Sequence, residues 1–404
     1  MRRRVLEFIG VAAVVVTVIV LLKLAPVPVG GQASRATATA GSAATTGPAP
    51  KTPWGEPDLQ GIWTDEHMTP LQRSAQYAGR EFFTDAERAA LDTQRAGIEL
   101  RPRQAGGTER DVAGAYNAVF MSVKPTGRRT SLVVDPSDGK IPPTTPELQN
   151  KLAGERQYRL ALLQATGTCK NQQPGCRGGK YGPPSPRRAE TPPRYSTVNI
   201  NRTDNPEDRS RSERCMAAVL PDFGGYRRVV QSPGSIAIFY DVGQGQGWQR
   251  NIPVDGSPHL PSHIRQRFGD SRGRWEGGTL VVDVANFTPT ADFMGSRENL
   301  HLVERWTRTG PNTLEYVVTI EDATTWTKPW TVKQEYTRQN EQANRIYYEP
   351  RCHEGNYGLA AVLAGGRAID KAFAERRGPH PASIDSATGM QAPEESTDPL
   401  TRQE

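Results

Sequence analysis

The sequence predicts a mainly β protein in which an antiparallel meander forms a barrel or a sandwich, with a few peripheral helices. Beyond residue 215, short segments rich in Val, Ile, Tyr, Trp and Thr are separated by turn residues at regular spacing, which is typical of consecutive antiparallel strands. The chain also contains 39 glycines and 33 prolines among its 404 residues. Much of it is therefore expected to form turns and loops around a core built from only part of the sequence.

The strands are expected where β-branched and aromatic residues dominate short runs. Residues 309–313 and 339–343 have the composition of hairpin connectors, and residues 270–273, Asp-Ser-Arg-Gly, that of a tight turn. The expected strands are 226–240, 247–254, 274–287, 300–309, 313–322, 331–338 and 345–349.

Three helices are expected around these strands. Thr84 and Glu87 form a capping box before an Ala-rich run that continues to about residue 95. Thr145, followed by a proline in the first turn, begins a second helix that runs to about residue 164. An Ala/Leu pattern over residues 357–373 predicts a terminal helix.

The N-terminus has the features of an export signal. Three arginines, Arg2 to Arg4, precede an apolar run over residues 8–22, which is shorter than the about 20 residues that a membrane span needs. Gly31 and Ala33 supply small residues at a cleavage site before Ser34. We expect a cleaved signal peptide and a periplasmic or secreted protein, with an uncleaved N-terminal anchor as the alternative; the arginines also loosely resemble a twin-arginine leader.

The composition divides the chain into segments. A flexible tether follows the leader, and a long stretch rich in Pro, Gly and Arg precedes the β region. The expected segments are a signal peptide or anchor (1–33), a tether (34–52), an N-terminal segment with two helices and short strands such as 130–135 that joins the main domain (53–165), a long loop (166–214), a β-rich core domain with its terminal helix (215–377) and a disordered tail (378–404).

Four cysteines in an exported protein are expected to form disulfides. Cys169 and Cys176 bracket a short loop and form the natural local pair. That pairing leaves Cys215 and Cys352 to join the start of the β region to its end. No CxxC pair occurs, so we expect neither a cysteine-rich metal site nor another cofactor.

Several long phrases of the sequence indicate a relationship. They are PWGEPDLQGIW at 53–63, GDSRGRWEG at 269–277, ENLHLVER at 298–305 and CHEGNYG at 352–358. On these phrases the chain resembles a family of uncharacterised exported bacterial proteins, which implies export but brings no activity. The opener Gly61-Ile-Trp63 with the run of hairpins also resembles the lipocalin-like group, which implies a barrel.

Charge and missing motifs exclude several classes of protein. The net charge of +6 comes from scattered arginines without interleaved aromatic residues, which is typical of a solvated surface, so no nucleic-acid partner is expected. A membrane contact is expected only through an uncleaved leader. No GxGxxG, P-loop or HExxH motif occurs, which counts against nucleotide enzymes and zincins.

Histidines beside carboxylates are the candidate catalytic residues, because imidazole titrates near neutral pH. His259 and His263 have the spacing of two metal ligands on a helix, but Pro261 between them argues against that helix and leaves a loop as the alternative. In the segment 299–306, alternation places His301 on the face opposite Glu304 and Trp306. The structural alternative is a histidine that simply hydrogen-bonds across the ladder.

His353 and Glu354 follow Cys352 directly, so a disulfide would hold them on a constrained backbone. A histidine with a nearby carboxylate can act as a general base; the alternative is a turn into the last helix that Glu354 caps. Arg272 and Arg274 could bind an anionic substrate through their guanidinium forks, or they could form surface ion pairs along a hairpin.

Two functions follow from these residues. The first is a binding protein for a small, largely apolar molecule in the cell envelope, with a cavity lined by Trp306, Tyr316, Trp326 and Trp330. The alternative is a lyase, isomerase or hydrolase in which His259, His301 and His353 transfer protons with Glu298 or Glu354. Convergence of two histidines on one cavity would favour the enzyme, and histidines scattered around the outside would favour the binding protein.

Overall fold

The structure is a computed structural model that describes residues 50–99, 124–193, 205–211, 213–216, 218–241, 247–339 and 356–384. All of these belong to one compact unit of the chain. The expected leader, most of the tether, the expected strand at 345–349 and most of the C-terminal tail lie outside the described residues.

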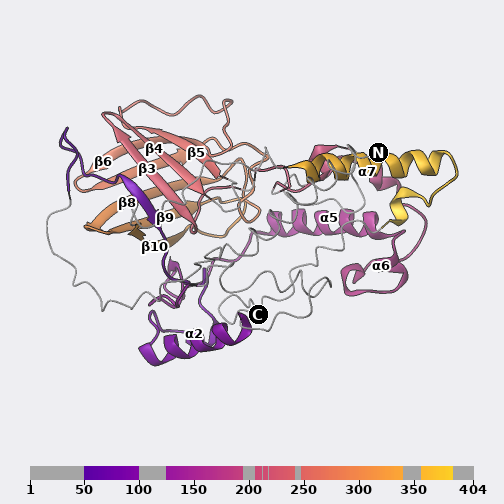
Figure 1. Cartoon of the computed structure of the whole chain (residues 1–404), viewed down its shortest axis with the longest axis horizontal. Helices are drawn as coiled ribbons and strands as arrows, with labels where there is room; N and C mark the ends of the chain where they lie inside the picture. Colours follow the sequence, from indigo (N-terminus) through magenta and orange to yellow (C-terminus); the bar gives the residue numbers. More distant parts are fainter. Residues whose placement is uncertain are drawn as a thin grey trace, which may run out of the picture. The chain divides into compact units, whose positions relative to one another are not determined.

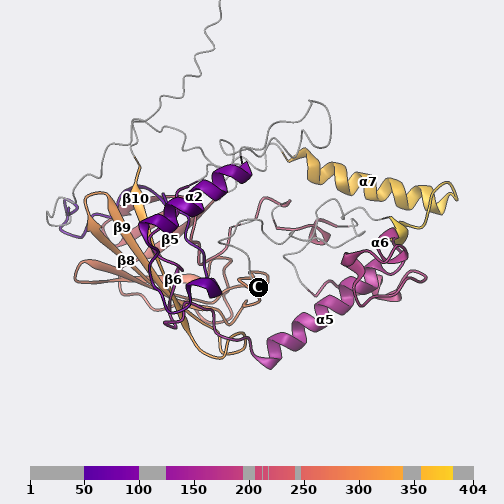
Figure 2. The same cartoon turned by 90° about the horizontal axis from the view of Figure 1, so that it is seen from below.

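The fold is mainly antiparallel β, as predicted, and the sheet curls into a nearly closed barrel rather than a sandwich. Figure 1 shows β3, β4 and β5 on one side of the interior and β8, β9 and β10 on the other, and Figure 2 shows the latter strands side by side from below. The strands are β1 (Gly61–Thr64), β2 (Val133–Asp135), β3 (Tyr226–Ser232), β4 (Ser235–Asp241), β5 (Gly247–Pro253), β6 (Asp270–Glu276), β7 (Thr279–Ala285), β8 (His301–Gly310), β9 (Thr313–Glu321) and β10 (Trp330–Arg338).

The strand order around the barrel is β5-β4-β3-β1-β10-β9-β8-β7-β6, and β2 pairs with β10. Two meanders, β3–β5 and β6–β10, are thus joined by the N-terminal strand β1, which pairs antiparallel with both β3 and β10. At the seam β5 and β6 approach each other without a continuous ladder. The Gly61-Ile-Trp63 opener therefore forms the strand that connects the two halves of the barrel.

The helices are α2 (Asp85–Glu99), α5 (Pro146–Leu163), α6 (Gly167–Lys170) and α7 (Tyr357–Ala374). The predicted capping box is confirmed: the Glu87 carboxylate accepts from the Thr84 backbone N–H at 2.8 Å, and the Thr84 hydroxyl accepts from the Glu87 N–H at 3.2 Å. Thr145 caps α5 as predicted by accepting from the Leu148 N–H. Among the described residues, no helix combines the length and apolar character needed to cross a membrane.

Three sequence-based predictions of the strands were wrong. Residues 274–287 contain the end of β6, a turn and β7, and not one strand. Residues 226–240 form a hairpin, β3 and β4, and not one strand, because Gly234 adopts a positive φ of 71° and reverses the chain. The segment Asp270-Ser-Arg-Gly is part of β6 and not a turn. The turn of that hairpin lies at Gly277, where the φ is 60°.

One disulfide is confirmed, between Cys169 and Cys176. Cys215 also takes part in a disulfide. Its predicted partner Cys352 lies outside the described residues, so that pairing stays a prediction. It is supported by Asn356, four residues beyond Cys352, whose side-chain amide contacts the Cys215 sulfur at 3.3 Å and donates to the Glu213 carbonyl at 2.7 Å.

Glycine at position 273 allows the barrel to close. A Cβ atom there would lie 3.0 Å from methyl carbons of both Ile252 and Val254, at the seam between β5 and β6. We expect Gly273→Ala to lower the free energy of unfolding by about 1–3 kcal/mol, because the added methyl overpacks this contact. Chemical denaturation would measure it. The matched control is Gly278→Ala, where the new methyl meets nothing within 4 Å; equal effects of the two substitutions would contradict the prediction.

Candidate functional site

The barrel interior contains a buried ion pair among mainly apolar side chains. Arg250 of β5 and Glu304 of β8 lie on strands that are not neighbours in the sheet, and the guanidinium donates to Glu304 Oε2 at 2.6 Å across the interior. Tyr316 of β9 donates its hydroxyl proton to Glu304 Oε1 at 2.8 Å. Both Arg250 and Glu304 are buried. The carboxylate is thus held from two sides, as a buried charge requires.

A second guanidinium, that of Arg227 in β3, is fully buried beside this pair. Its central carbon lies 3.8 Å from the centroid of the Tyr336 ring and 5.8 Å from that of Trp306. One nitrogen, Nη2, donates to the Gly224 carbonyl at 2.9 Å and contacts Asp222 at 3.4 Å. The aromatic faces stabilise the positive charge at this place, but Nε and Nη1 of the guanidinium have no hydrogen-bond partner among the described residues.

Six polar atoms in this region have no hydrogen-bond partner within the described part of the chain. They are Nε and Nη1 of Arg227, Nε and Nη1 of Arg250, the Tyr240 hydroxyl and Nε1 of Trp306. Tyr240 brings them together, because both guanidiniums lie within 5.7 Å of its ring centroid. Buried polar groups in native proteins are almost always paired, so an unpaired cluster of this size requires an explanation.

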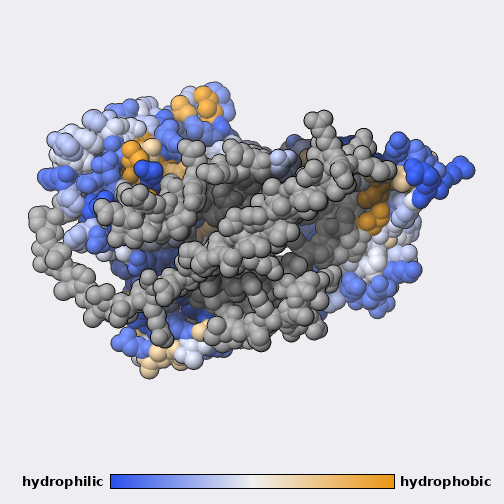
Figure 3. All heavy atoms as spheres, in the orientation of Figure 1, coloured by the Kyte–Doolittle hydropathy of each residue, from blue (hydrophilic) through white to orange (hydrophobic). Residues whose placement is uncertain are grey.

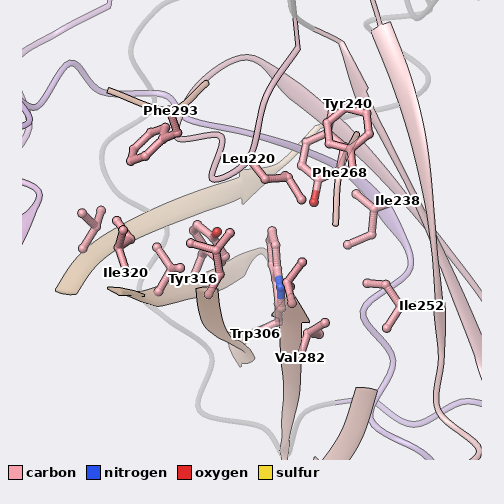
Figure 4. Packing of buried hydrophobic residues seen from close by; sticks show 14 of the residues in the cluster. Leu220, Ile238, Tyr240, Ile252, Phe268, Val282, Phe293, Trp306, Tyr316 and Ile320 are labelled. Atoms are coloured by element: carbon pink, nitrogen blue, oxygen red, sulfur yellow. The ribbon is translucent and has the colours of Figure 1, made fainter. Parts of the chain in front are cut away.

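The aromatic residues predicted to line the cavity belong to the buried core, at two different levels. Trp306 and Tyr316 lie in the charged region with ring centroids 4.2 Å apart, and Figure 4 shows Trp306 between Tyr316 on one side and Ile238 and Ile252 on the other. Trp330, at the start of β10, and Trp326, in the connection before it, pack edge to face at the opposite end. Nε1 of Trp330 is also buried without a hydrogen-bond partner among the described residues, but of the two pairs it is Trp306 and Tyr316 that adjoin the charged groups.

Two predicted histidines converge on one carboxylate, on the outer face of the barrel. His259, from the connection between β5 and β6, and His301, at the start of β8, both place Nε2 against Asp283 Oδ1, at 2.8 and 3.1 Å. Their other ring nitrogens contact Asp270 at 2.9 Å and Glu321 at 2.9 Å, respectively. The result is a continuous chain of alternating carboxylates and imidazoles.

Strand alternation explains why this chain lies outside the barrel. Val282 and Val284 of β7 point into the core, so Asp283 between them points outward, where it is partly exposed. His301 is paired in register with Glu321 across the β8–β9 hairpin. Among the described residues, no group of three or more His, Cys, Asp or Glu is arranged to hold a metal ion, and His263 lies exposed and apart from this chain.

The contacts of His301 with these carboxylates make the protein's stability depend on pH. The hydrogen bond from His301 to Asp283 raises the pKa of His301 to about 9, and the same bond lowers the pKa of Asp283. The protonated histidine contributes its full stability below the pKa of the unfolded state, 6.5. This contribution is lost as the pH rises through the folded-state pKa of about 9. The carboxylate contribution is present above the unfolded value of 3.8 and is lost as the pH falls through the lowered pKa.

Between pH 6 and pH 9.5 we expect the wild type to lose about 1–2 kcal/mol more unfolding free energy than His301→Gln. This value allows for solvent screening of a partly exposed pair. Denaturant titrations at the two pH values measure the difference. The variant His263→Gln serves as the control, because His263 is exposed and does not belong to the chain of imidazoles and carboxylates. Parallel pH profiles of the wild type and His301→Gln would refute the coupling.

Several other candidate residues are not brought into this arrangement. His353 and Glu354 lie outside the described residues. Glu298 is held through its main chain, where its carbonyl accepts from Arg265 at 2.8 Å. The carboxylates that contact His301 are instead Asp283 and Glu321, which sequence reasoning did not select as site residues. Hairpin register is the signal that would have found Glu321.

The two arginines predicted to bind an anion have protein partners. Arg272 donates to the Pro258 carbonyl at 2.6 Å and pairs with Asp270 at 3.0 Å. Arg274 pairs with Glu276 at 2.7 Å on the exposed surface. The arrangement is that of ion pairs along a hairpin, the ordinary alternative considered for them.

Residues 269–273, Gly-Asp-Ser-Arg-Gly, also have the spacing of a G-x-S-x-G nucleophile motif, which the sequence reasoning missed. That motif needs a strand-to-helix turn that exposes the serine. Here Ser271 lies buried within β6, whereas His259 contacts Asp270 and Asp283. The segment therefore does not form a nucleophile elbow.

Comparison with known proteins identifies no family: no protein-family model matches the chain, and no curated protein does. Solved structures with partial similarity include secretory abundant heat soluble protein 4 from Ramazzottius varieornatus, with 12% identity, a TM-score of 0.20 and coverage of 28% of this chain and 69% of that one. The wild-type fluorescent protein UnaG has 15% identity, a TM-score of 0.18 and coverage of 28% of this chain and 72% of that one.

Proposed function

We propose that this protein binds a small, largely apolar molecule inside its barrel, in the cell envelope after export. The observation that carries the proposal is the set of buried, unpaired polar atoms of Arg227, Tyr240, Arg250 and Trp306 within a mainly apolar lining. Small-molecule sites are mostly apolar with a few placed polar groups that orient the ligand. A core built for packing alone would not retain so many unpaired donors, because each costs about 1–3 kcal/mol.

The outer surface supports an interior site. In the view of Figure 3 the described surface is mostly hydrophilic, and apolar colour is confined to small separate patches. The coloured part of that face thus presents an apolar molecule with small patches alone. Export is supported by the leader in the sequence and by the Cys169–Cys176 disulfide, a bond typical of oxidising compartments.

The alternative function is proton-transfer catalysis by the chain of histidines and carboxylates. The contacts of His259 and His301 with Asp283 favour it, since a histidine oriented by a carboxylate can act as a general base. The chain lies on the outer face, however, and not beside the interior lining. Binding is therefore the function that the geometry supports better.

Native mass spectrometry of the mature protein, purified from an oxidising compartment, tests the binding function directly. A retained organic mass that disappears on denaturation, and that extracts into an apolar solvent, is the expected result. A retained mass that is strongly polar would contradict the proposal. So would a bare protein that takes up no apolar molecule from a mixed extract of envelope lipids.

Tyr240→Phe is expected to separate stability from binding. The substitution removes only a buried hydroxyl that has no partner within the described residues, so the ligand-free protein should gain about 1 kcal/mol in unfolding free energy. Retention of the ligand in native mass spectra should fall, because both guanidiniums lie within 5.7 Å of the Tyr240 ring centroid. Tyr226→Phe, on the exposed face of β3, is the matched control. Lower stability with unchanged retention would show that the hydroxyl serves packing alone.

A further inference from the structure

The two buried arginines in the barrel differ in how closely each is paired with a carboxylate. Arg250 has a short ion pair with Glu304, but Arg227 contacts its carboxylate, Asp222, only at 3.4 Å. Burial raises the pKa of Asp222, which weakens it further as a partner for the guanidinium. Both arginines remain charged at any pH at which the protein folds. The region therefore contains two guanidinium charges but only one closely paired carboxylate charge.

The unpaired donors are of the kind that an anion accepts. On each guanidinium the free atoms are Nε and Nη1, while Nη2 is committed to protein acceptors. A carboxylate has two oxygens and about four lone-pair sites, so it can receive hydrogen bonds from more than one of these atoms. A neutral hydroxyl or ketone would leave most of them unpaired and would not balance the charge.

The interior changes character along the barrel axis. Strand register places Arg227, Tyr240, Tyr316 and Tyr336 toward the end that carries the β8–β9 turn. The opposite end is apolar, with aliphatic side chains beside the Trp326–Trp330 pair. Its inward side chains include Ile236, Val284, Leu302, Ile320 and Trp330. A molecule with one charged end and one hydrocarbon end matches this polarity.

We propose, resting on the binding function above, that the ligand is an amphipathic carboxylate whose head is bound by the guanidiniums of Arg227 and Arg250 and whose hydrocarbon part points toward the apolar end of the barrel. Tyr240 and Trp306 complete the head site, each with one buried polar atom that has no hydrogen-bond partner among the described residues. The ion pair with Glu304 holds Arg250 in place, so that Arg227 supplies the uncompensated charge.

Isothermal titration of the ligand-free mature protein with dodecanoate and with dodecan-1-ol tests this assignment. The two molecules share one hydrocarbon chain and differ in the charge of the head. We expect the carboxylate to bind about tenfold to a hundredfold more tightly, the size of one or two hydrogen bonds to a charged group. In Arg227→Met this preference should fall to nearly none, whereas Arg228→Met, its outward-facing neighbour on β3, should retain it.

The outcomes separate this inference from the binding function. Equal affinity of the wild type for acid and alcohol would overturn the carboxylate site but leave binding of apolar molecules intact. Failure to bind either molecule, across chain lengths from octyl to hexadecyl, would overturn both. An undiminished preference in Arg227→Met, with a native near-ultraviolet circular dichroism spectrum, would remove Arg227 from the site. The wild-type comparison does not depend on any variant folding.

Discussion

Glu304→Gln is expected to lower the free energy of unfolding by about 3–5 kcal/mol, the usual cost of removing one partner of a buried ion pair. Glu304 is completely buried and accepts hydrogen bonds from both Arg250 and Tyr316. Its loss leaves a guanidinium without a counter-charge in the centre of the barrel, where water cannot solvate it. Urea denaturation of the ligand-free protein at neutral pH measures the effect.

Two further variants make this expectation specific. The double variant Arg250→Met/Glu304→Leu removes both charges and should recover most of the lost stability, since apolar residues of similar volume often replace buried ion pairs without cost. Glu276→Gln disrupts ion pairs with Arg274 and Arg305 on the exposed surface and should cost far less stability than Glu304→Gln. If Glu304→Gln cost no more than Glu276→Gln, the pair would not be buried in solution.

Loss of the predicted Cys215–Cys352 disulfide is expected to cost about 5 kcal/mol of unfolding free energy. In the chain-entropy model the stabilisation grows with the length of the closed loop, and this loop includes every strand from β3 to β10. The local Cys169–Cys176 disulfide, with a sequence separation of 7, should contribute only about 2.5 kcal/mol in the same model. The long-range bond is thus the more important of the two for stability.

The comparison uses two double variants, Cys215→Ser/Cys352→Ser and Cys169→Ser/Cys176→Ser, each unfolded in denaturant beside the oxidised wild type. Peptide mapping without reduction establishes the pairing first. Recovery of Cys215 linked to Cys169 or Cys176 would contradict it, and so would a larger loss of stability from the local pair than from the long-range pair.

Local pattern predicted the secondary structure well where its signals lie close together in the sequence. The capping box at Thr84 and Glu87 and the N-cap at Thr145 are each complete within a few residues, so the helix starts could be predicted from sequence alone. The run over 226–240 was misjudged because its β-branched residues hid the turn at Gly234. A proline directly before that glycine was the signal against a single strand.

The candidate site was harder to predict because its contacts depend on which strands become neighbours. Arg250 and Glu304 belong to strands that do not pair, and they meet only because the sheet curls back on itself. Alternation alone correctly separated His301 from Glu304 on opposite faces of β8. The contact of His259 with Asp283 depends on the irregular connection between β5 and β6. This connection has no periodic pattern of apolar residues from which its course could be predicted.

The place of β1 has a consequence for how the chain reaches its native state. This strand is the first in the sequence, yet one of its two partners, β10, is the last described strand. The ring cannot be completed until the chain as far as Arg338 is free to fold, so its final ladder joins segments of very large sequence separation. Such pairings form slowly, because the chain loses the entropy of closing a long loop before the contacts of the ladder stabilise it. A chain synthesised from its N-terminus therefore keeps its barrel open until the segment that ends at Arg338 has been made.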